Sequence, residues 1–303
     1  MKTEYHIIWV DDELDTVEID ISDTIEFLSN FGIEAKIKTL EAIGGIDIQE
    51  KIKTELQDPE LDLIVVDFLM PDVKGDTLID NIRTSDHVFL PVIFYSQNGI
   101  KALFTQVEEL QLDGVYIAHR DRLIDKIKEV TTSLLRKEQT TKRTRGLLME
   151  GVSEIDANFG KLFINLWDIL NDNQKQILIL YLKEKLSERK SNTDKFIEKI
   201  PDSLDEFRSS MENNFVSQKF DTYMRWKVIK KAFSLLDNNS DEVEIFYRLF
   251  DRRNGSEPLA VMRNKYGHKT REELERTHNP ELCKYIREEL RNQLNNMMTL
   301  LSK

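Results

Sequence analysis

Cysteine occurs once in the 303 residues, at Cys283. A single thiol excludes an intramolecular disulfide and a zinc site built from several cysteines. Long hydrophobic runs are also missing, since no eighteen consecutive apolar residues exist, which a membrane-spanning helix needs. Residues 1–6 lead directly into a strand-like segment, so we expect no signal peptide. These absences predict a cytoplasmic protein with no membrane contact.

Positive charge is in the minority. The chain has 43 Lys and Arg against 55 Asp and Glu, which gives a formal net charge of -12. Such a balance disfavours general attraction to nucleic acid, although a local basic patch can still bind it. DNA is therefore not an expected partner. The length suggests about two domains, and the 40% hydrophobic and 32% charged residues are typical of a globular protein.

Short apolar segments rich in β-branched residues alternate with helical patterns in the first part of the chain. The segments are residues 6–10, 34–38, 61–66, 88–95 and 115–118, of which 34–38 is the least apolar. Between them, apolar residues recur three or four positions apart over 14–28, 100–110 and 123–134. Strands that alternate with helices indicate βαβ units and a parallel sheet. We therefore expect a flavodoxin-like α/β domain with a five-stranded parallel sheet over residues 1–135.

The pattern changes after this domain. Residues 136–145 are polar and basic, and we interpret 136–150 as a linker or an extended helix. A nucleic-acid contact of this segment is the alternative to a solvated connector. From 151 to 303 only helical periodicity is found, with a strong helix start at Asn279-Pro280 and an end near Leu301. The second domain is expected to be all-helical.

Acidic residues follow two of the predicted strands. Asp11 and Asp12 end the first strand, and Asp67 ends the third. The carboxyl ends of parallel strands meet at one edge of a sheet, so these side chains should converge. Carboxylates that crowd together raise one another's pKa unless a cation lies among them. Oxygen ligands with high negative charge suit Mg²⁺, and one of the acids could then accept a phosphoryl group.

At these residues the chain resembles the receiver domain of two-component response regulators. The matching motifs are the pair Asp11-Asp12, the segment 67–75 with Met70-Pro71 and Gly75, and the segment 91–96. The resemblance implies that Asp67 is phosphorylated, that Asp11, Asp12 and Asp67 bind Mg²⁺, and that Ser96 contacts the phosphoryl group. Taken singly, Asp11-Asp12 could instead cap the next helix, and Ser96 could be a turn residue.

The fifth strand departs from the family pattern. The family has a lysine there, normally followed by proline, and this chain has His119 and then Arg120. An imidazole is shorter and titrates near neutral pH, whereas a guanidinium supplies a permanent charge. Tyr116 matches the aromatic residue that swings inward when the family is activated, or it is simply a strand residue with a solvated hydroxyl.

The helical domain carries one short candidate motif, Arg263-Asn264 followed by His268. It resembles the catalytic motif of HEPN domains, all-α folds that often act as dimeric, metal-independent ribonucleases. The resemblance implies that His268 is a general acid or base, Arg263 a phosphate contact and Asn264 a support. The alternative is that these residues lie on a solvated helix.

Three functions follow from these patterns. The first is a response regulator of a phosphorelay, phosphorylated by a sensor histidine kinase, in which the helical domain changes its association as a homodimer or its partner binding. The second is a receiver-gated HEPN-like ribonuclease, in which case RNA is the substrate. The third is a phosphate sink without active output. Whether the chain is an enzyme beyond its own phosphorylation stays open at the level of sequence.

Overall fold

The computed structural model describes most of the chain. The described residues are 2–42, 46–55, 58–70, 90–97, 100–109, 114–188, 200–201, 203–216, 220–252 and 255–303. Contacts divide the chain into two compact units. The first comprises Met1–Arg143 and His278–Arg287, and the second comprises Thr144–Thr277 and Glu288–Lys303. The domain boundaries at 135 and 151 stay predictions.

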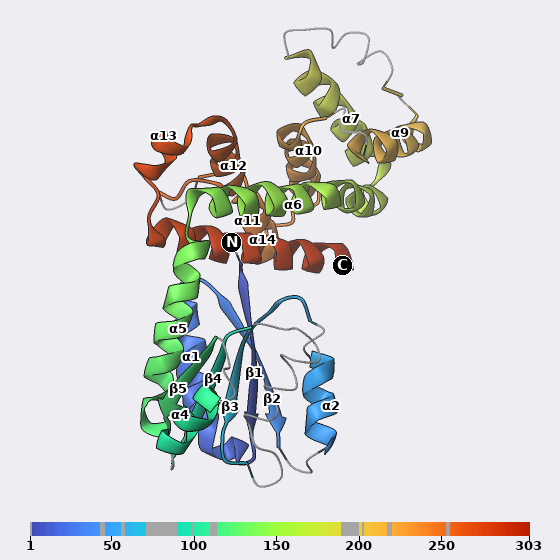
Figure 1. Ribbon diagram of the computed structural model, residues 1–303. Coiled ribbons are helices and arrows are strands. Elements are labelled where there is room, and N and C mark those ends of the chain that lie inside the picture. The colour runs from blue at the N-terminus through green and yellow to red at the C-terminus, as the bar shows by residue number, and fades with distance from the viewer. Residues whose placement is uncertain are drawn as a thin grey trace. The chain divides into compact units, whose positions relative to one another are not determined.

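The first unit is built on a five-stranded parallel sheet (Figure 1). Its strands are β1 Glu4–Asp11, β2 Glu34–Glu41, β3 Leu61–Asp67, β4 Val92–Ser96 and β5 Val115–His119. They lie in the order β2-β1-β3-β4-β5, and every pair is parallel. This is the flavodoxin-like order, in which the chain changes winding direction between β1 and β3. The predicted fold class is confirmed.

Both faces of the sheet are buried, as a parallel sheet requires. The helical elements of this unit are η1 Leu14–Val17, α1 Glu18–Ser29, α2 Ile46–Glu55, α4 Ile100–Glu109, η2 Arg120–Arg122 and α5 Leu123–Glu138. Successive strand residues point to opposite faces. Ile7 and Trp9 pack with residues of α1 and α5, and Ile8 and Val10 pack with residues of α2 and α4.

The strands differ from the predicted segments mainly at their ends. The apolar segment 88–95 yields a strand only from Val92, and residues 88–89 lie outside the described part of the chain. Pro91 cannot donate a hydrogen bond to a neighbouring strand, although its carbonyl oxygen accepts one from the Ile64 N–H at 3.1 Å. Of the segment 136–150, residues 136–138 belong to α5 and residues from 141 onward belong to α6.

The rest of the described chain is helical. The elements are α6 Thr141–Ile169, α7 Asp172–Ser187, α9 Leu204–Val216, α10 Thr222–Leu235, α11 Asp241–Tyr247, α12 Leu259–His268, α13 Arg271–Glu275 and α14 Pro280–Ser302. No strand follows β5 among the described residues, which confirms the all-helical prediction. None of the helices in the described ranges is both long and apolar enough to cross a membrane.

Candidate functional site

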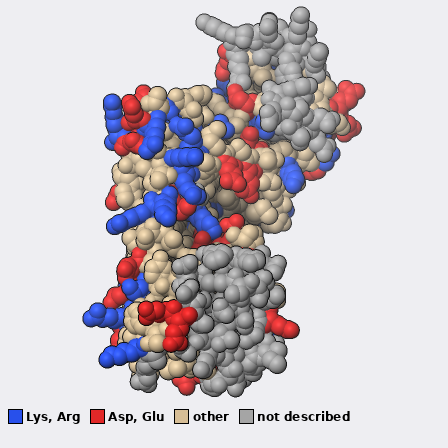
Figure 2. Space-filling view, viewed as in Figure 1, with Lys and Arg blue, Asp and Glu red and all other residues tan. Residues whose placement is uncertain are grey.

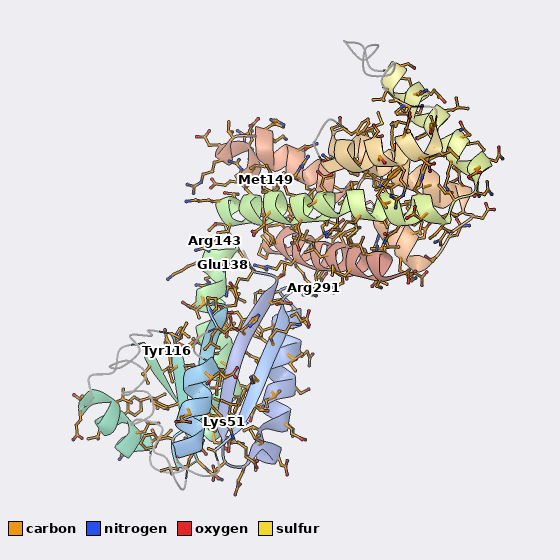
Figure 3. All side chains as sticks on the ribbon, turned by 90° about the vertical axis from the view of Figure 1, so that its right-hand side faces the viewer. Lys51, Tyr116, Glu138, Arg143, Met149 and Arg291 are labelled. Carbon is orange, nitrogen blue, oxygen red and sulfur yellow. The ribbon has the colours of Figure 1, made fainter. Side chains whose placement is uncertain are left out.

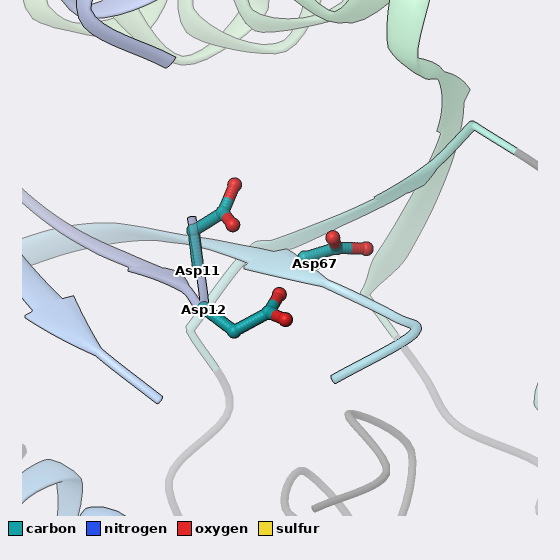
Figure 4. A group of neighbouring side chains, drawn as sticks. All are labelled: Asp11, Asp12 and Asp67. Carbon is teal, nitrogen blue, oxygen red and sulfur yellow. The ribbon is translucent and has the colours of Figure 1, made fainter. Parts of the chain in front are cut away.

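Three carboxylates converge at the carboxyl edge of the sheet (Figure 4). Asp11 is the last residue of β1, Asp12 follows it, and Asp67 is the last residue of the adjacent β3. One carboxylate oxygen of each residue lies within 4.8 Å of one from each of the others. The strand order alone brings these residues together, because β1 and β3 end side by side at the switch point of the sheet.

Asp11 is held by a network inside the protein. Its side chain is 1% exposed. Its Oδ1 accepts a hydrogen bond from the Glu13 N–H at 2.8 Å, and its Oδ2 accepts one from the Tyr95 hydroxyl. The Tyr95 hydroxyl in turn accepts a hydrogen bond from the Trp9 indole N–H at 3.1 Å. Buried polar groups require such partners, and this network supplies them to both oxygens of the Asp11 carboxylate.

Asp67 lies in a different environment. The pKa of its carboxyl is raised to about 6. Burial is the main cause, the charges of Asp11 and Asp12 also raise the pKa, and the Leu69 N–H and Arg120 lower it. The Leu69 N–H donates to Asp67 Oδ1 at 3.1 Å. The raised pKa means that the negative charge of Asp67 is incompletely compensated by the protein's own groups.

The residues present fit a hard divalent cation. The site opens as a pocket of about 410 Å³ whose lining includes the three aspartates, Glu13, Ser96 and Arg120. Carboxylate oxygens are the ligands that Mg²⁺ prefers, and Mg²⁺ also retains several waters. Asp12 and Asp67 are the residues suited to direct coordination. Asp11 already accepts from three donors, so a water-mediated contact suits it better.

The third donor to Asp11 is Arg120, directly after β5. Its Nη1 lies 3.3 Å from Asp11 Oδ2, and its Nη2 donates to Thr16 Oγ1 at 2.8 Å. Its guanidinium carbon lies 5.0 Å from the centroid of the Tyr95 ring. His119 is placed differently: its Nδ1 accepts from the Asp121 N–H at 3.3 Å, and it does not line the pocket. Of the two residues predicted to replace the family lysine, Arg120 is the one in the pocket.

Ser96 and Tyr116 belong to the neighbouring strands β4 and β5. Ser96 ends β4, is 1% exposed and lines the pocket. It pairs in register with His119. Tyr116 is 39% exposed and belongs to β5, as the labelled side chain in Figure 3 shows. Met70 is buried, while Pro71, Gly75 and the rest of that motif lie outside the described residues.

The motif of the helical unit lies on α12. Arg263 donates through Nε and Nη2 to Oδ1 of the adjacent Asn264, at 3.2 and 3.0 Å. His268 is the last residue of the helix and is exposed. Five residues of α-helix turn the side-chain direction by about 140°, so Arg263 and His268 leave the helix on different sides. Figure 2 shows basic side chains mixed with acidic ones over α12 and α13. The assignment of these residues to catalysis stays a prediction.

Sequence reasoning missed the side chains that hold Asp11. Trp9, Tyr95 and Thr16 were not predicted to take part in the site. Strand parity is the signal that could have identified two of them: Trp9 lies two residues before Asp11, and Tyr95 is in register with Asp67. Thr16 lies in the η1 helix, which is too short to be predicted from hydrophobic periodicity.

Two solved structures that match this chain are distant from it in sequence. No family model and no curated protein sequence matches the chain. Solved structures do match. Full-length FixJ from B. japonicum is 16% identical, with 77% of this chain and 99% of FixJ covered and a TM-score of 0.33. The RcsB response regulator of Salmonella typhimurium, described for its conformational dynamism in DNA interaction, is 14% identical, with 74% and 97% covered and a TM-score of 0.34.

Superpositions this poor support no conclusion about the chain. The strand order itself shows that the first unit has a flavodoxin-like fold, with three aspartates gathered at the carboxyl edge of its sheet and a helical unit after it.

Metal binding should stabilise the first unit. At 100 times its dissociation constant, Mg²⁺ should add about 2.7 kcal/mol to the free energy of unfolding. Asp12→Asn should remove most of that gain, whereas Asp15→Asn, an exposed acid in η1, should keep it. Asp67→Asn should also raise the melting temperature without Mg²⁺, because it removes a carboxylate whose ionised form the fold disfavours. Differential scanning calorimetry measures each shift. An undiminished Mg²⁺ response in Asp12→Asn would contradict the site.

The two residues at the end of β5 should differ sharply in their effect on stability. Arg120→Ala leaves buried Asp11 with one fewer donor, so it should cost about 1–3 kcal/mol in urea denaturation. It should also tighten Mg²⁺ binding, because a positive charge leaves the pocket. His119→Ala should change stability by less than about 0.5 kcal/mol. Equal effects of the two substitutions would show that Arg120 has no special role.

Proposed function

We propose that this chain is a response regulator whose receiver domain is phosphorylated on Asp67 with Mg²⁺ as cofactor. The observation that carries the proposal is the convergence of Asp11, Asp12 and Asp67 at the ends of two adjacent strands. The protein's own groups compensate the negative charge of Asp67 incompletely, as its raised pKa indicates. This suits a carboxylate that binds a metal ion and reacts.

The chemistry follows from the positions of the residues. An Asp67 oxygen attacks the phosphorus of a phosphorylated histidine in the kinase, the new O–P bond forms, and the N–P bond breaks. The leaving imidazole takes up a proton. Asp12 and Asp67 would hold Mg²⁺, which would supply positive charge against the transferring group. Arg120 contributes a positive charge next to Asp11, and Ser96 lies in the pocket to contact the phosphoryl oxygens.

The response to phosphorylation starts at Ser96. Ser96 ends β4, which pairs with β5, and α4 contacts β5. Two large side chains on this surface are exposed, Phe104 of α4 at 56% and Tyr116 of β5 at 39%. A surface of this kind changes its contacts when a phosphoryl group draws Ser96 inward. The output is then a change in association or partner binding, with a sensor histidine kinase as the donor.

The ribonuclease alternative needs a second subunit. Arg263 and His268 leave α12 in different directions, so a cleft containing both has to be completed across a dimer. The phosphate-sink alternative needs only the receiver. RcsB is described in connection with DNA interaction. The sequence of this chain shows no basic recognition helix, and the expectation against DNA stays a prediction.

Phosphorylation should depend on one residue. With acetyl phosphate and Mg²⁺, intact-mass spectrometry should show the gain of one phosphoryl group, which EDTA prevents. Asp67→Asn should abolish it, because Asp67 lines the pocket at the end of β3 and is the acid that we propose as acceptor. Asp15→Asn is the matched control and should be modified like the parent. Unchanged modification of Asp67→Asn would show that the acceptor lies elsewhere.

Phosphorylation should also change the association state. Light scattering on the phosphorylated full chain should give about twice the monomer mass, since symmetric dimers are the commonest soluble oligomers. The same samples, incubated with labelled RNA, test the nuclease alternative. Cleavage only by the dimer, lost in His268→Ala but kept in Lys269→Ala, would favour it. Equal mass in both states and intact RNA would exclude the gated nuclease and leave two functions, a switch of partner binding and a phosphate sink.

A further inference from the structure

The helical unit contains a groove lined by aromatic and basic side chains. It has a volume of about 350 Å³, which is in the range of small ligand sites. It lies between α7 and α10, both labelled in Figure 1, and the residue Asp251. The lining residues are Tyr181, Tyr223, Trp226, Lys227, Lys230, Lys231, Ser234 and Asp251. None of them belongs to the acidic pocket.

One face of α10 supplies most of this groove. Tyr223, Lys227, Lys230 and Ser234 recur three or four residues apart, which places them along one side of a helix. The helix has no acidic residue between Thr222 and Leu235. Three lysines and one aspartate line the groove, so its formal charge is 3 − 1 = +2 in a chain whose net charge is -12. The groove therefore has a local charge opposite to that of the whole chain.

Three aromatic rings pack against one another at this groove. Tyr223 stacks on Trp226, with ring centroids 5.8 Å apart and planes at 13°. Phe250 lies 5.2 Å from both rings and supports them from behind. Trp226 is 3% exposed, but Tyr223 is 44% exposed. A flat ring that is fixed by its neighbours and open to solvent is a platform on which another planar group can stack.

The lysines lie over these rings. Lys227 Nζ is 4.5 Å from the Tyr223 centroid, and Lys231 Nζ is 5.9 Å from the Tyr181 centroid. Lys230 contacts the Trp226 ring and also pairs with Asp251. Among the described residues, no carboxylate lies within ion-pair distance of Lys227 or Lys231. Two ammonium groups beside an exposed ring are thus available to an anion.

We propose that this groove binds single-stranded nucleic acid. Alternating phosphates and flat bases match alternating ammonium groups and rings, and base stacking on an aromatic side chain is tolerant of sequence. An acidic peptide would satisfy the lysines but would leave the Tyr223 platform unused. The groove takes a nucleotide unit by stacking its base on Tyr223. Lys227, whose Nζ lies over that ring in the free protein, moves to an adjoining phosphate, and Lys231 contacts the next one. This activity is independent of Asp67 and of the motif on α12.

The test uses the full chain and fluorescein-labelled twelve-nucleotide oligo(dT) and oligo(U), measured by anisotropy at 50 mM salt. The slope of log K against log[salt] should be about −1.4 for the two phosphate contacts of Lys227 and Lys231, and each removed lysine should reduce it by about 0.7. Tyr223→Ala should bind about tenfold more weakly, and Tyr223→Phe should bind like the parent. Lys227→Gln with Lys231→Gln should weaken binding without disturbing the core. Lys161→Gln, an exposed lysine of α6, is the matched control.

Several outcomes would overturn the proposal. No binding by the parent chain, or equal loss in the Lys161 control and in the groove variants, would do so. Poly-glutamate that binds while the oligonucleotides do not would assign the groove to acidic peptides. If heparin competes equally well and Tyr223→Ala has no effect, the groove is a general anion-binding surface. Retention of binding in Asp67→Asn is expected and separates this inference from the fate of the phosphorylation proposal.

Discussion

The chemistry of this molecule depends on one constraint, which is the concentration of negative charge at the carboxyl ends of two adjacent strands. The flavodoxin-like order forces β1 and β3 to end together, and both end in aspartate. The protein compensates one of these charges internally, because Asp11 receives the Tyr95 hydroxyl, the Glu13 N–H and Arg120. Asp12 and Asp67 lack comparable internal compensation, which leaves them for a cation and for reaction.

Arg120 changes the usual balance of such a pocket. A lysine is a flexible point charge, whereas a guanidinium forms several directed contacts and packs on aromatic faces. Here it contacts Asp11 and Thr16 and lies over Tyr95, so it is built into the wall of the pocket. A charge held this way stabilises the domain before any phosphoryl group arrives. It also has less freedom to follow the phosphoryl group than a lysine would have.

The sequence predicted the sheet, the acids and the all-helical second part, because short apolar segments and strand-end aspartates follow from the burial of both sheet faces. It could not decide between His119 and Arg120, since adjacent residues after a strand point in directions that only the local turn determines. The hydrogen bonds from Trp9 to Tyr95 and from Tyr95 to Asp11 depend on the register between β1 and β4, which are distant in sequence. The groove on α10 could not be predicted, because helical periodicity does not show which side of a helix its neighbours leave open.

The central claim is that Asp67 is an acceptor carboxylate in a Mg²⁺ pocket shared with Asp12. Binding of beryllium fluoride, which mimics a phosphoryl group on a carboxylate, tests it most directly by ¹⁹F NMR. The account predicts protein-bound fluorine resonances in the full chain that appear only with Mg²⁺ and vanish in Asp67→Asn and Asp12→Asn, while Asp15→Asn retains them. Bound resonances that persist in Asp67→Asn, or that form without Mg²⁺, would contradict it.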